Sequence, residues 1–132
     1  MIPLHEINNT WTLFLDRDGV INYEKHKDYI HTWDEFVFYP YSKLALKIFA
    51  EIFGKIIVVT NQRGVGRGIT KPGNLALIHQ YMLKEIQHSG GRIDRIYLCT
   101  DLEDSSPNRN LTREWVWRQS WITRPSILAV RW

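Results

Sequence analysis

Lys55-Ile56-Ile57-Val58-Val59-Thr60-Asn61 is the stretch of sequence that decides the fold. Its four consecutive β-branched apolar residues are typical of a strand that is buried on both faces of a parallel sheet. A glycine-rich segment, residues 62–68, follows directly. Ligands of open parallel sheets bind beyond the carboxyl ends of the strands, so this segment is a candidate binding loop.

Segments on both sides of this strand alternate in type. Thr10–Leu15 is a run of β-formers, and Arg95–Cys99 is a second such run. Helices are predicted from Pro40 to Phe53 and from Pro72 to His88, because apolar residues recur there at helical spacing and glycines follow. Strand, helix, strand, helix, strand predicts an α/β fold with a parallel sheet. Residues 20–39 carry no helical period, and we expect an irregular hairpin within 29–38.

Composition points to one globular domain. The chain has 132 residues, of which 44% are hydrophobic and 23% charged. Its single cysteine, Cys99, cannot form an internal disulfide, so a reducing, cytoplasmic location is expected. The N-terminus lacks the pattern of a signal peptide, and no segment has the length and apolarity of a membrane span. Secreted disulfide-rich, membrane and disordered proteins are poor fits.

The C-terminal part differs in composition from the rest. From Arg109 onward there are five arginines and one glutamate, whereas residues 1–108 carry 12 basic and 13 acidic side chains. Four of the six tryptophans also lie in this tail. We expect no helix or strand in it and poor anchoring to the sheet. With only three strands and no closing helix before it, the fold looks C-terminally truncated.

Two loops at strand ends carry candidate chemistry. Asp16 and Asp18 follow the first strand, and a pair of carboxylates at this spacing can bind Mg²⁺ or divide nucleophilic and proton-transfer roles. The alternative is a structural role, because most Asp-x-Asp pairs are helix N-caps or solvated turns. Thr60 and Asn61 end the central strand, where they could donate hydrogen bonds to a phosphate. A flexible glycine-rich connection is the alternative there.

Taken together, the two loops resemble a known family. Leu-Phe-Leu-Asp-Arg-Asp-Gly-Val-Ile-Asn at 13–22 and Val-Val-Thr-Asn-Gln-Arg-Gly-Val-Gly-Arg-Gly at 58–68 resemble the first two motifs of the haloacid dehalogenase-like phosphatases. The similarity is greatest to the branch of heptose-bisphosphate and histidinol-phosphate phosphatases, and it covers about residues 10–109. It implies a Rossmann-like parallel sheet with helices on both faces. It also implies a core in residues 1–109 and an aberrant tail in 110–132.

The resemblance implies a role for individual residues. Asp16 would be the nucleophile that forms an aspartyl-phosphate, and Asp18 would be the general acid and base. Mg²⁺ would be held by the Asp16 carboxylate and the Asp18 backbone carbonyl. Further residues are expected to bind the phosphoryl group or to shape the substrate pocket: Thr60, Asn61, Gln62, Arg63, Arg67, Arg109, Arg17 and Asn22.

Two departures from the family pattern concern the tail. The zinc loop of three cysteines and one histidine is lacking, since Cys99 is the only cysteine, so no zinc is expected. An Arg-Lys-Pro motif is also lacking, because Arg109 is followed by Asn110. One base restored before the Asn110 codon permits the reading Arg-Lys-Pro-Asn-Pro-Gly-Met-Gly-Leu from Arg109. We therefore hypothesise that residues 110–132 are out of frame; a genuine Trp/Arg-rich tail is the alternative.

These observations favour a Mg²⁺-dependent phosphatase of a small phosphorylated metabolite, with a heptose bisphosphate preferred and histidinol phosphate second. Low activity is expected of this exact chain. A non-catalytic phosphate binder remains open, because the lysine is lacking. A nucleic-acid binder would use the basic tail, with tryptophans stacking on bases. We expect neither a nucleic-acid nor a membrane partner.

Overall fold

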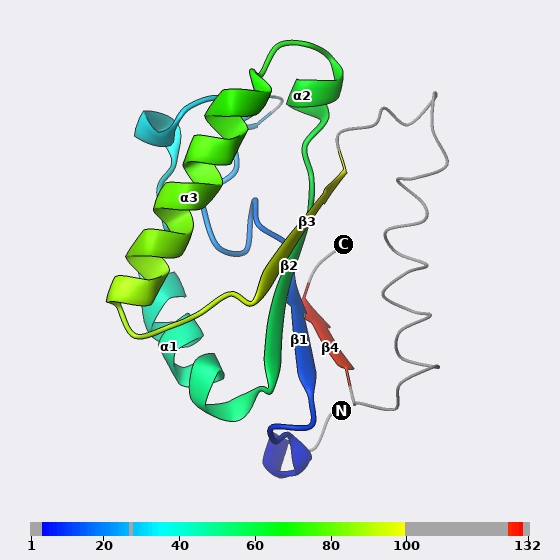
Figure 1. Cartoon of the computed structure of the whole chain (residues 1–132), viewed down its shortest axis with the longest axis vertical. Helices are drawn as coiled ribbons and strands as arrows, with labels where there is room; N and C mark the ends of the chain where they lie inside the picture. The colour runs from blue at the N-terminus through cyan, green and yellow to red at the C-terminus, as the bar shows by residue number, and fades with distance from the viewer. Residues whose placement is uncertain (1–3, 27, 100–126, 131–132) are drawn as a thin grey trace.

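The computed structural model describes residues 4–26, 28–99 and 127–130. One sheet and three helices organise this part of the chain (Figure 1). The elements, in chain order, are a 3-10 turn Leu4–Glu6, β1 Thr12–Leu15, a 3-10 turn Trp33–Glu35, α1 Ser42–Ile52, β2 Lys55–Asn61, α2 Arg63–Gly66, α3 Pro72–His88, β3 Arg95–Cys99 and β4 Ile127–Val130.

The four strands form one parallel sheet in the order β3-β2-β1-β4. The hydrophobic strand β2 lies inside the sheet, with Leu13 of β1 opposite Ile56 and Ile96 of β3 opposite Val58. The predicted parallel α/β fold, with the strand at 55–59 beside the strand at 11–15, is confirmed. Both strands end at the same edge of the sheet, which is where ligands of such sheets bind.

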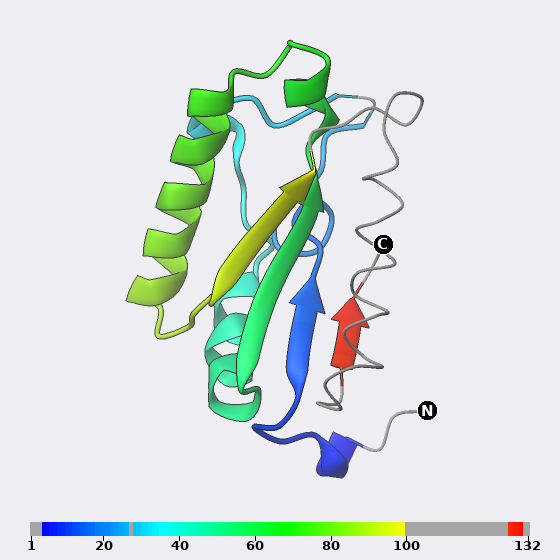
Figure 2. The ribbon, with the colours of Figure 1, turned by 45° about the vertical axis from the view of Figure 1, so that its right-hand side comes forward.

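Helices α1 and α3 cover one face of the sheet (Figures 1 and 2). Because β1, β2 and β3 are added in one direction, right-handed crossovers place both connecting helices on the same side. The main core lies under them and joins Leu13, Ile56 and Val58 of the sheet to Leu46 of α1 and Met82 of α3. The segment between β3 and β4, on which helical cover of the second face depends, falls outside the described residues.

Local sequence sets the helix limits. Helix α3 begins at Pro72 and ends at His88, as predicted, and Gly90 follows with a φ of 87°. Helix α1 ends at Ile52, close to the predicted limit. Glycine is required at position 54 because the backbone of Asn9 lies against it. A Cβ there would lie 2.1 Å from the carbonyl oxygen of Asn9. The segment before β1 therefore passes directly over this glycine.

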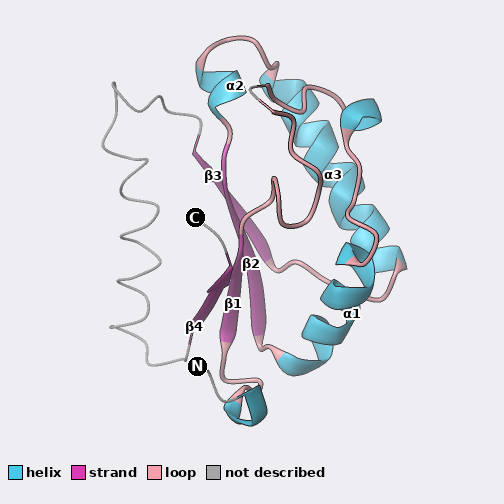
Figure 3. Cartoon of the chain, turned by 180° about the vertical axis from the view of Figure 1, so that it is seen from behind, coloured by secondary structure: helices cyan, strands magenta, loops and turns pink. Residues whose placement is uncertain are grey.

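The predicted hairpin within 29–38 is wrong. A 3-10 turn, Trp33–Glu35, lies in this segment, and Phe38 forms an antiparallel bridge with Asn22 instead of with residues 29–31. The Trp33 ring stacks on Phe36 at 5.0 Å and contacts Tyr81 of α3 at 5.5 Å between ring centroids. This segment therefore packs against α3, as the view from behind in Figure 3 shows.

The expectation of no strand in the tail is also wrong. Ile127–Val130 forms β4 and pairs in parallel with β1, with Leu128 opposite Leu13. Its four residues are all aliphatic and two of them, Ile127 and Val130, are β-branched, which suits a strand despite the arginines nearby in the sequence. The expected division at residue 109 falls outside the described residues. Among the helices that the structure describes, none is long and apolar enough to cross a membrane.

Candidate active site

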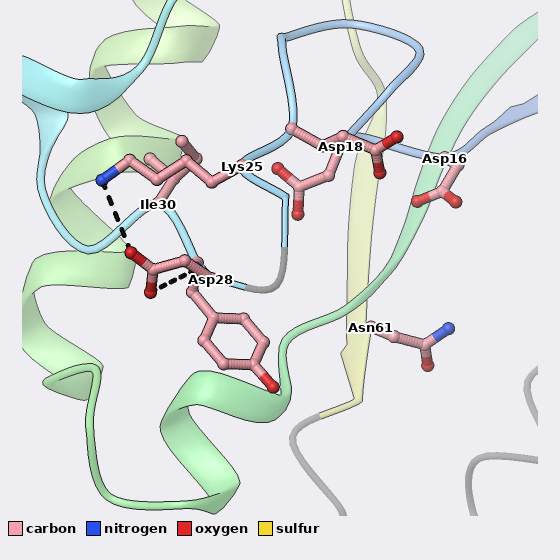
Figure 4. Close-up of a pocket in the computed structure, with 8 residues that line it drawn as sticks. Asp16, Asp18, Lys25, Asp28, Ile30 and Asn61 are labelled. Carbon is pink, nitrogen blue, oxygen red and sulfur yellow. Dashed lines mark hydrogen bonds and ion pairs between the residues drawn. The ribbon is translucent and has the colours of Figure 1, made fainter.

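A cavity of about 210 Å³ opens where β1 and β2 end. Figure 4 shows Asp16 and Asp18, which follow β1, and Asn61 at the end of β2 around it. The lining residues that come from the loop after β1 are Glu24, Lys25, Asp28, Tyr29 and Ile30. The two predicted strand-end loops therefore converge on one cavity, as their placement at the carboxyl edge required.

The Asp18 carboxylate is held by side chains from two loops. Its Oδ1 accepts hydrogen bonds from Arg17 Nε at 3.2 Å, from Arg17 Nη2 at 2.8 Å and from Asn22 Nδ2 at 2.9 Å. Its Oδ2 accepts one from Gln62 Nε2 at 3.1 Å. Asp16 has a different environment, in which its Oδ1 accepts the backbone N–H of Arg17 at 2.8 Å. The pair thus differs in surroundings, although only one residue separates them.

A hydrogen-bonded glutamine connects the two loops. Gln62 is buried and donates both to Asp18 and to the hydroxyl of Thr60, the latter at 2.8 Å. Thr60 itself is buried and lies beside the cavity without lining it. Asn61 lines the cavity, and its buried Oδ1 has no hydrogen-bond partner among the described residues. The oxygen of this amide can only accept a hydrogen bond, and its N–H₂ group is the part that can donate to a phosphate.

Arg17 and Asn22 both contact Asp18. Both are fully buried and neither is among the cavity-lining residues, so their expected part in shaping the substrate pocket stays a prediction. Both side chains donate hydrogen bonds to the Asp18 carboxylate, Arg17 through Nε and Nη2 and Asn22 through Nδ2. Arg67 is exposed beyond α2 and is not among the lining residues. The Arg63 side chain and Arg109 lie outside the part that the structure describes.

Behind Asp18, Arg17 reaches helix α3. Its Nη1 lies 3.0 Å from Nε2 of His79, a buried residue of α3, and its guanidinium lies 5.8 Å from the centre of the Phe36 ring. Burial and then the positive charge of Arg17 lower the pKa of His79 from 6.5 to about 4. His79 is therefore neutral at pH 7, and its Nε2 accepts the hydrogen bond from Arg17.

The cavity residues from the loop after β1 were missed by sequence reasoning. Lys25 forms ion pairs with Glu35 and Asp28, and the latter pair is 4.0 Å long. The pKa of Asp28 is lowered, chiefly by the hydrogen bond from the Tyr29 backbone N–H and then by that from His31. No periodic pattern marks this loop, so only the fold brings it to the cavity. It adds one cationic side chain, Lys25, and two anionic ones, Glu24 and Asp28, to the cavity lining.

The donor set at the cavity fits a hard divalent cation. Asp16 and Asp18 offer carboxylate and backbone oxygen, the ligands that Mg²⁺ prefers, and Mg²⁺ commonly keeps several waters. Across residues 4–26, 28–99 and 127–130 no group of three or more His, Cys, Asp or Glu is placed to hold a metal. The zinc expectation concerns the segment after β3, which is not described.

Curated relatives align with most of this chain. No family model matches the chain. It is 34% identical over 113 residues to a D-glycero-alpha-D-manno-heptose-1,7-bisphosphate 7-phosphatase of Mycobacterium tuberculosis, a match that covers 82% of this chain and 60% of that protein. It is also 36% identical over 86 residues to a D-glycero-beta-D-manno-heptose-1,7-bisphosphate 7-phosphatase of Rhodopseudomonas palustris. That match covers 65% of this chain and 47% of that protein. The chain thus spans about half of the length of these relatives.

A solved structure shares the fold. The D,D-heptose 1,7-bisphosphate phosphatase of B. bronchiseptica, complexed with magnesium and phosphate, superimposes with a TM-score of 0.66 at 27% identity. The superposition covers 79% of this chain and 63% of that one. The sequence match and the parallel sheet agree with the resemblance of the two strand-end motifs. The chain therefore belongs to the haloacid dehalogenase-like phosphatases, in the branch that holds the heptose-bisphosphate and histidinol-phosphate phosphatases.

Proposed function

We propose that this chain hydrolyses a phosphate monoester of a heptose bisphosphate through an aspartyl-phosphate on Asp16. The observation that carries the proposal is the meeting of Asp16 and Asp18 at one cavity, with Gln62 linking Asp18 to Thr60. A nucleophile and a proton donor beside phosphate-binding groups are what phosphoryl transfer needs. The printed names of the relatives support the choice of sugar.

In the first step a carboxylate oxygen of Asp16 attacks phosphorus. The new O–P bond forms as the bond between phosphorus and the sugar oxygen breaks, and the departing oxygen takes a proton from Asp18. The phosphoryl group is now bound to Asp16, and the sugar alcohol leaves. Protonation of the leaving oxygen avoids an unstable alkoxide, and a positioned acid commonly contributes about 10²- to 10⁴-fold in rate.

In the second step water attacks the phosphorus of the aspartyl-phosphate. Asp18, now ionised, removes a proton from that water, and the bond between Asp16 and phosphorus breaks. Inorganic phosphate leaves, Asp16 is a carboxylate again, and Asp18 is again protonated. The balance is one ester and one water consumed for one alcohol and one phosphate.

Other residues bind the phosphoryl oxygens. The Thr60 hydroxyl accepts from Gln62, which leaves its own proton to donate, and the Asn61 amide can donate from the cavity wall. A Mg²⁺ ion held by Asp16 and Asp18 would neutralise phosphoryl charge. Both contributions oppose the repulsion between the Asp16 carboxylate and an anionic substrate.

The test is phosphate release by the purified chain, followed over hours because no lysine follows Arg109. We expect release from heptose 1,7-bisphosphate and p-nitrophenyl phosphate that stops with EDTA and with Asp16→Asn. Asp34→Asn, which changes an exposed aspartate outside the cavity, is the matched control. Binding of phosphate without Asp16-dependent release would identify a binder instead of an enzyme, and preference for histidinol phosphate would overturn the choice of substrate.

A further inference from the structure

A buried guanidinium connects Asp18 to helix α3, on the side of Asp18 away from the cavity. We propose that His79, acting through Arg17, is a positioning residue that fixes the Asp18 carboxylate so that Oδ2 is the oxygen that transfers the proton. The inference rests on the proposed function, because it assigns a task to residues that support the proposed acid and base. It adds to that function a residue 61 positions away in the sequence from Asp18.

The two oxygens of Asp18 have unequal environments. Three N–H groups donate to Oδ1, two from Arg17 and one from Asn22, at 2.8 to 3.2 Å. A proton on Oδ1 would face these donors and displace at least one of them. Among the residues that the structure describes, Oδ2 accepts a single hydrogen bond, at 3.1 Å from Gln62, and so keeps room for a proton. The hydrogen bonds therefore divide the carboxylate into an anchored oxygen and a reactive one.

Arg17 can hold Oδ1 in this way because its own orientation is fixed. The guanidinium is fully buried, Nε and Nη2 donate to Asp18, and Nη1 donates to His79 at 3.0 Å. A guanidinium is planar, so these donors rotate together. Turning it away from Asp18 would also break its contact with His79 and leave buried N–H groups without acceptors. The acceptor on α3 thus stabilises the hydrogen bonds at the cavity.

His79 can accept this hydrogen bond only as the neutral imidazole. Its side chain is buried in α3 beneath the loop, and burial together with the charge of Arg17 keeps its pKa near 4. Nε2 then carries the lone pair and Nδ1 the proton. A cationic imidazole would offer only donors to a guanidinium, which has no acceptor. The uncharged state at pH 7 is therefore what the contact requires.

Two amide substitutions separate the positioning contact from mere packing. In His79→Gln the amide reaches about as far as Nε2 and can accept from Arg17, whereas the shorter amide of His79→Asn ends near the position of Nδ1. Both replace an imidazole by a neutral polar group, so neither introduces charge into the core. His88→Asn, at an exposed position near the end of the same helix, is the matched control.

The first readout is independent of activity. In the unmodified chain, NMR should detect the Arg17 Nε–H as a slowly exchanging signal. His79→Asn should speed its exchange at least about tenfold, while His79→Gln and His88→Asn should change it less than about threefold. Fast Arg17 exchange in the unmodified chain, or equal exchange in the glutamine and asparagine variants, overturns the inference. Folding of each variant is checked by the dispersion of the remaining amide signals.

The second readout is Asp16-dependent phosphate release. Misplacement of a catalytic group by about 1 Å can cost about 10²-fold, so His79→Asn should lower kcat by about ten- to a hundredfold. KM should stay within about twofold, and His79→Gln should restore most of kcat. Equal kcat in the asparagine variant and the control overturns the inference. Lack of Asp16-dependent release by the unmodified chain overturns the proposed function instead, while the exchange rates still decide whether His79 holds Arg17.

Discussion

At the scale of single residues, burial and charge act together on Arg17. A fully buried cation is costly unless it is paired and hydrogen-bonded, and Arg17 is balanced by one carboxylate, one imidazole and an aromatic face. That arrangement lies within 3.2 Å of the proposed acid and base. The same contacts that make the cation tolerable therefore also determine the environment of Asp18.

His79 makes stability depend on pH. Its folded pKa of about 4 lies below the ordinary 6.5, so the unfolded chain binds the proton more strongly and the folded chain loses stability as pH falls. The contribution is complete above pH 6.5 and disappears progressively toward pH 4. Between pH 7 and pH 5 this group alone should cost about 2 kcal/mol of the free energy of unfolding. Urea unfolding at pH 7 and pH 5 should show that His79→Gln loses less free energy of unfolding than the unmodified chain does. An equal loss in the two proteins would contradict this role of His79.

Gly54 and Gly73 should respond in opposite ways to alanine. A Cβ at Gly54 would lie 2.1 Å from the backbone oxygen of Asn9, so Gly54→Ala must displace backbone and should cost at least about 2 kcal/mol. Gly73, in the first turn of α3, has no atom within 4 Å of such a Cβ. Gly73→Ala should therefore be neutral or stabilise by up to about 1 kcal/mol. Thermal unfolding of both variants decides; similar Tm values would refute the contact.

At the scale of elements, Arg92 caps the carboxyl end of α1 with hydrogen bonds. Its guanidinium donates to the carbonyl oxygens of Ala50 at 2.6 Å and Phe53 at 2.7 Å and pairs with Asp94 at 3.1 Å. Asp94 in turn accepts the backbone N–H of Ile56 in β2 at 2.8 Å. One side chain thus joins the end of α1 to the start of β2 and the residues before β3.

Removing this junction should destabilise the fold. Arg92→Ala leaves carbonyl oxygens of the last helical turn without their donor, and we expect a loss of about 2 kcal/mol, since hydrogen bonds to charged groups contribute about 1.5–3 kcal/mol. The measurement is the urea midpoint, with Lys84→Ala, an exposed position on α3, as the control. A loss no larger than that of the control would show that Arg92 is not a significant junction.

Elements with a local signal could be predicted from the sequence. Helix α3 and strand β3 have the predicted bounds because period, proline and glycine signals lie within them. The turn at Trp33–Glu35 could not be predicted in this way, because its aromatic packing depends on contact with Tyr81 of α3. Strand β4 is only four residues long, and its partner β1 lies more than a hundred residues earlier. Contacts distant in sequence carry no local pattern.

The same reason divides the candidate site. Asp16 and Asp18 follow β1 and Asn61 ends β2, so the expectation of a parallel sheet already predicted that they meet at the cavity. Lys25 and Tyr29 reach it through an irregular loop, and His79 touches Arg17 only because α3 packs under that loop. A buried histidine on the apolar side of a helix is the one signal that could have marked His79.

At the scale of the whole molecule, residues far apart complete one sheet. Strands β1, β2 and β3 come from the part that carries the family motifs, and β4 from the tail of different composition. The described part of the site uses residues 16–62 and helix α3, and no residue of β4 is among the residues that line the cavity. We propose that residues 110–132 are nevertheless out of frame, because the rereading from Arg109 restores a lysine and a Pro-Gly pair together.

The last prediction follows from that frame. With no lysine after Arg109, less positive charge opposes the repulsion between Asp16 and an incoming phosphate, and loss of one such contact commonly costs about 10²-fold or more. The 132-residue chain should therefore turn over p-nitrophenyl phosphate slowly. Restoring one base before the Asn110 codon, with the downstream frame, should raise Mg²⁺-dependent turnover by about a hundredfold or more.

Asp16→Asn in the restored protein is the control for this experiment, because it keeps the restored segment and removes the nucleophile. Its turnover should fall to the level of a sample with EDTA. An alternative in which the basic tail is a genuine nucleic-acid-binding segment makes a separate forecast, namely DNA binding that weakens steeply with salt. Ordinary enzymatic rates in the unrestored chain would refute the frame argument, since the missing positive charge would then have to come from a group among residues 1–132.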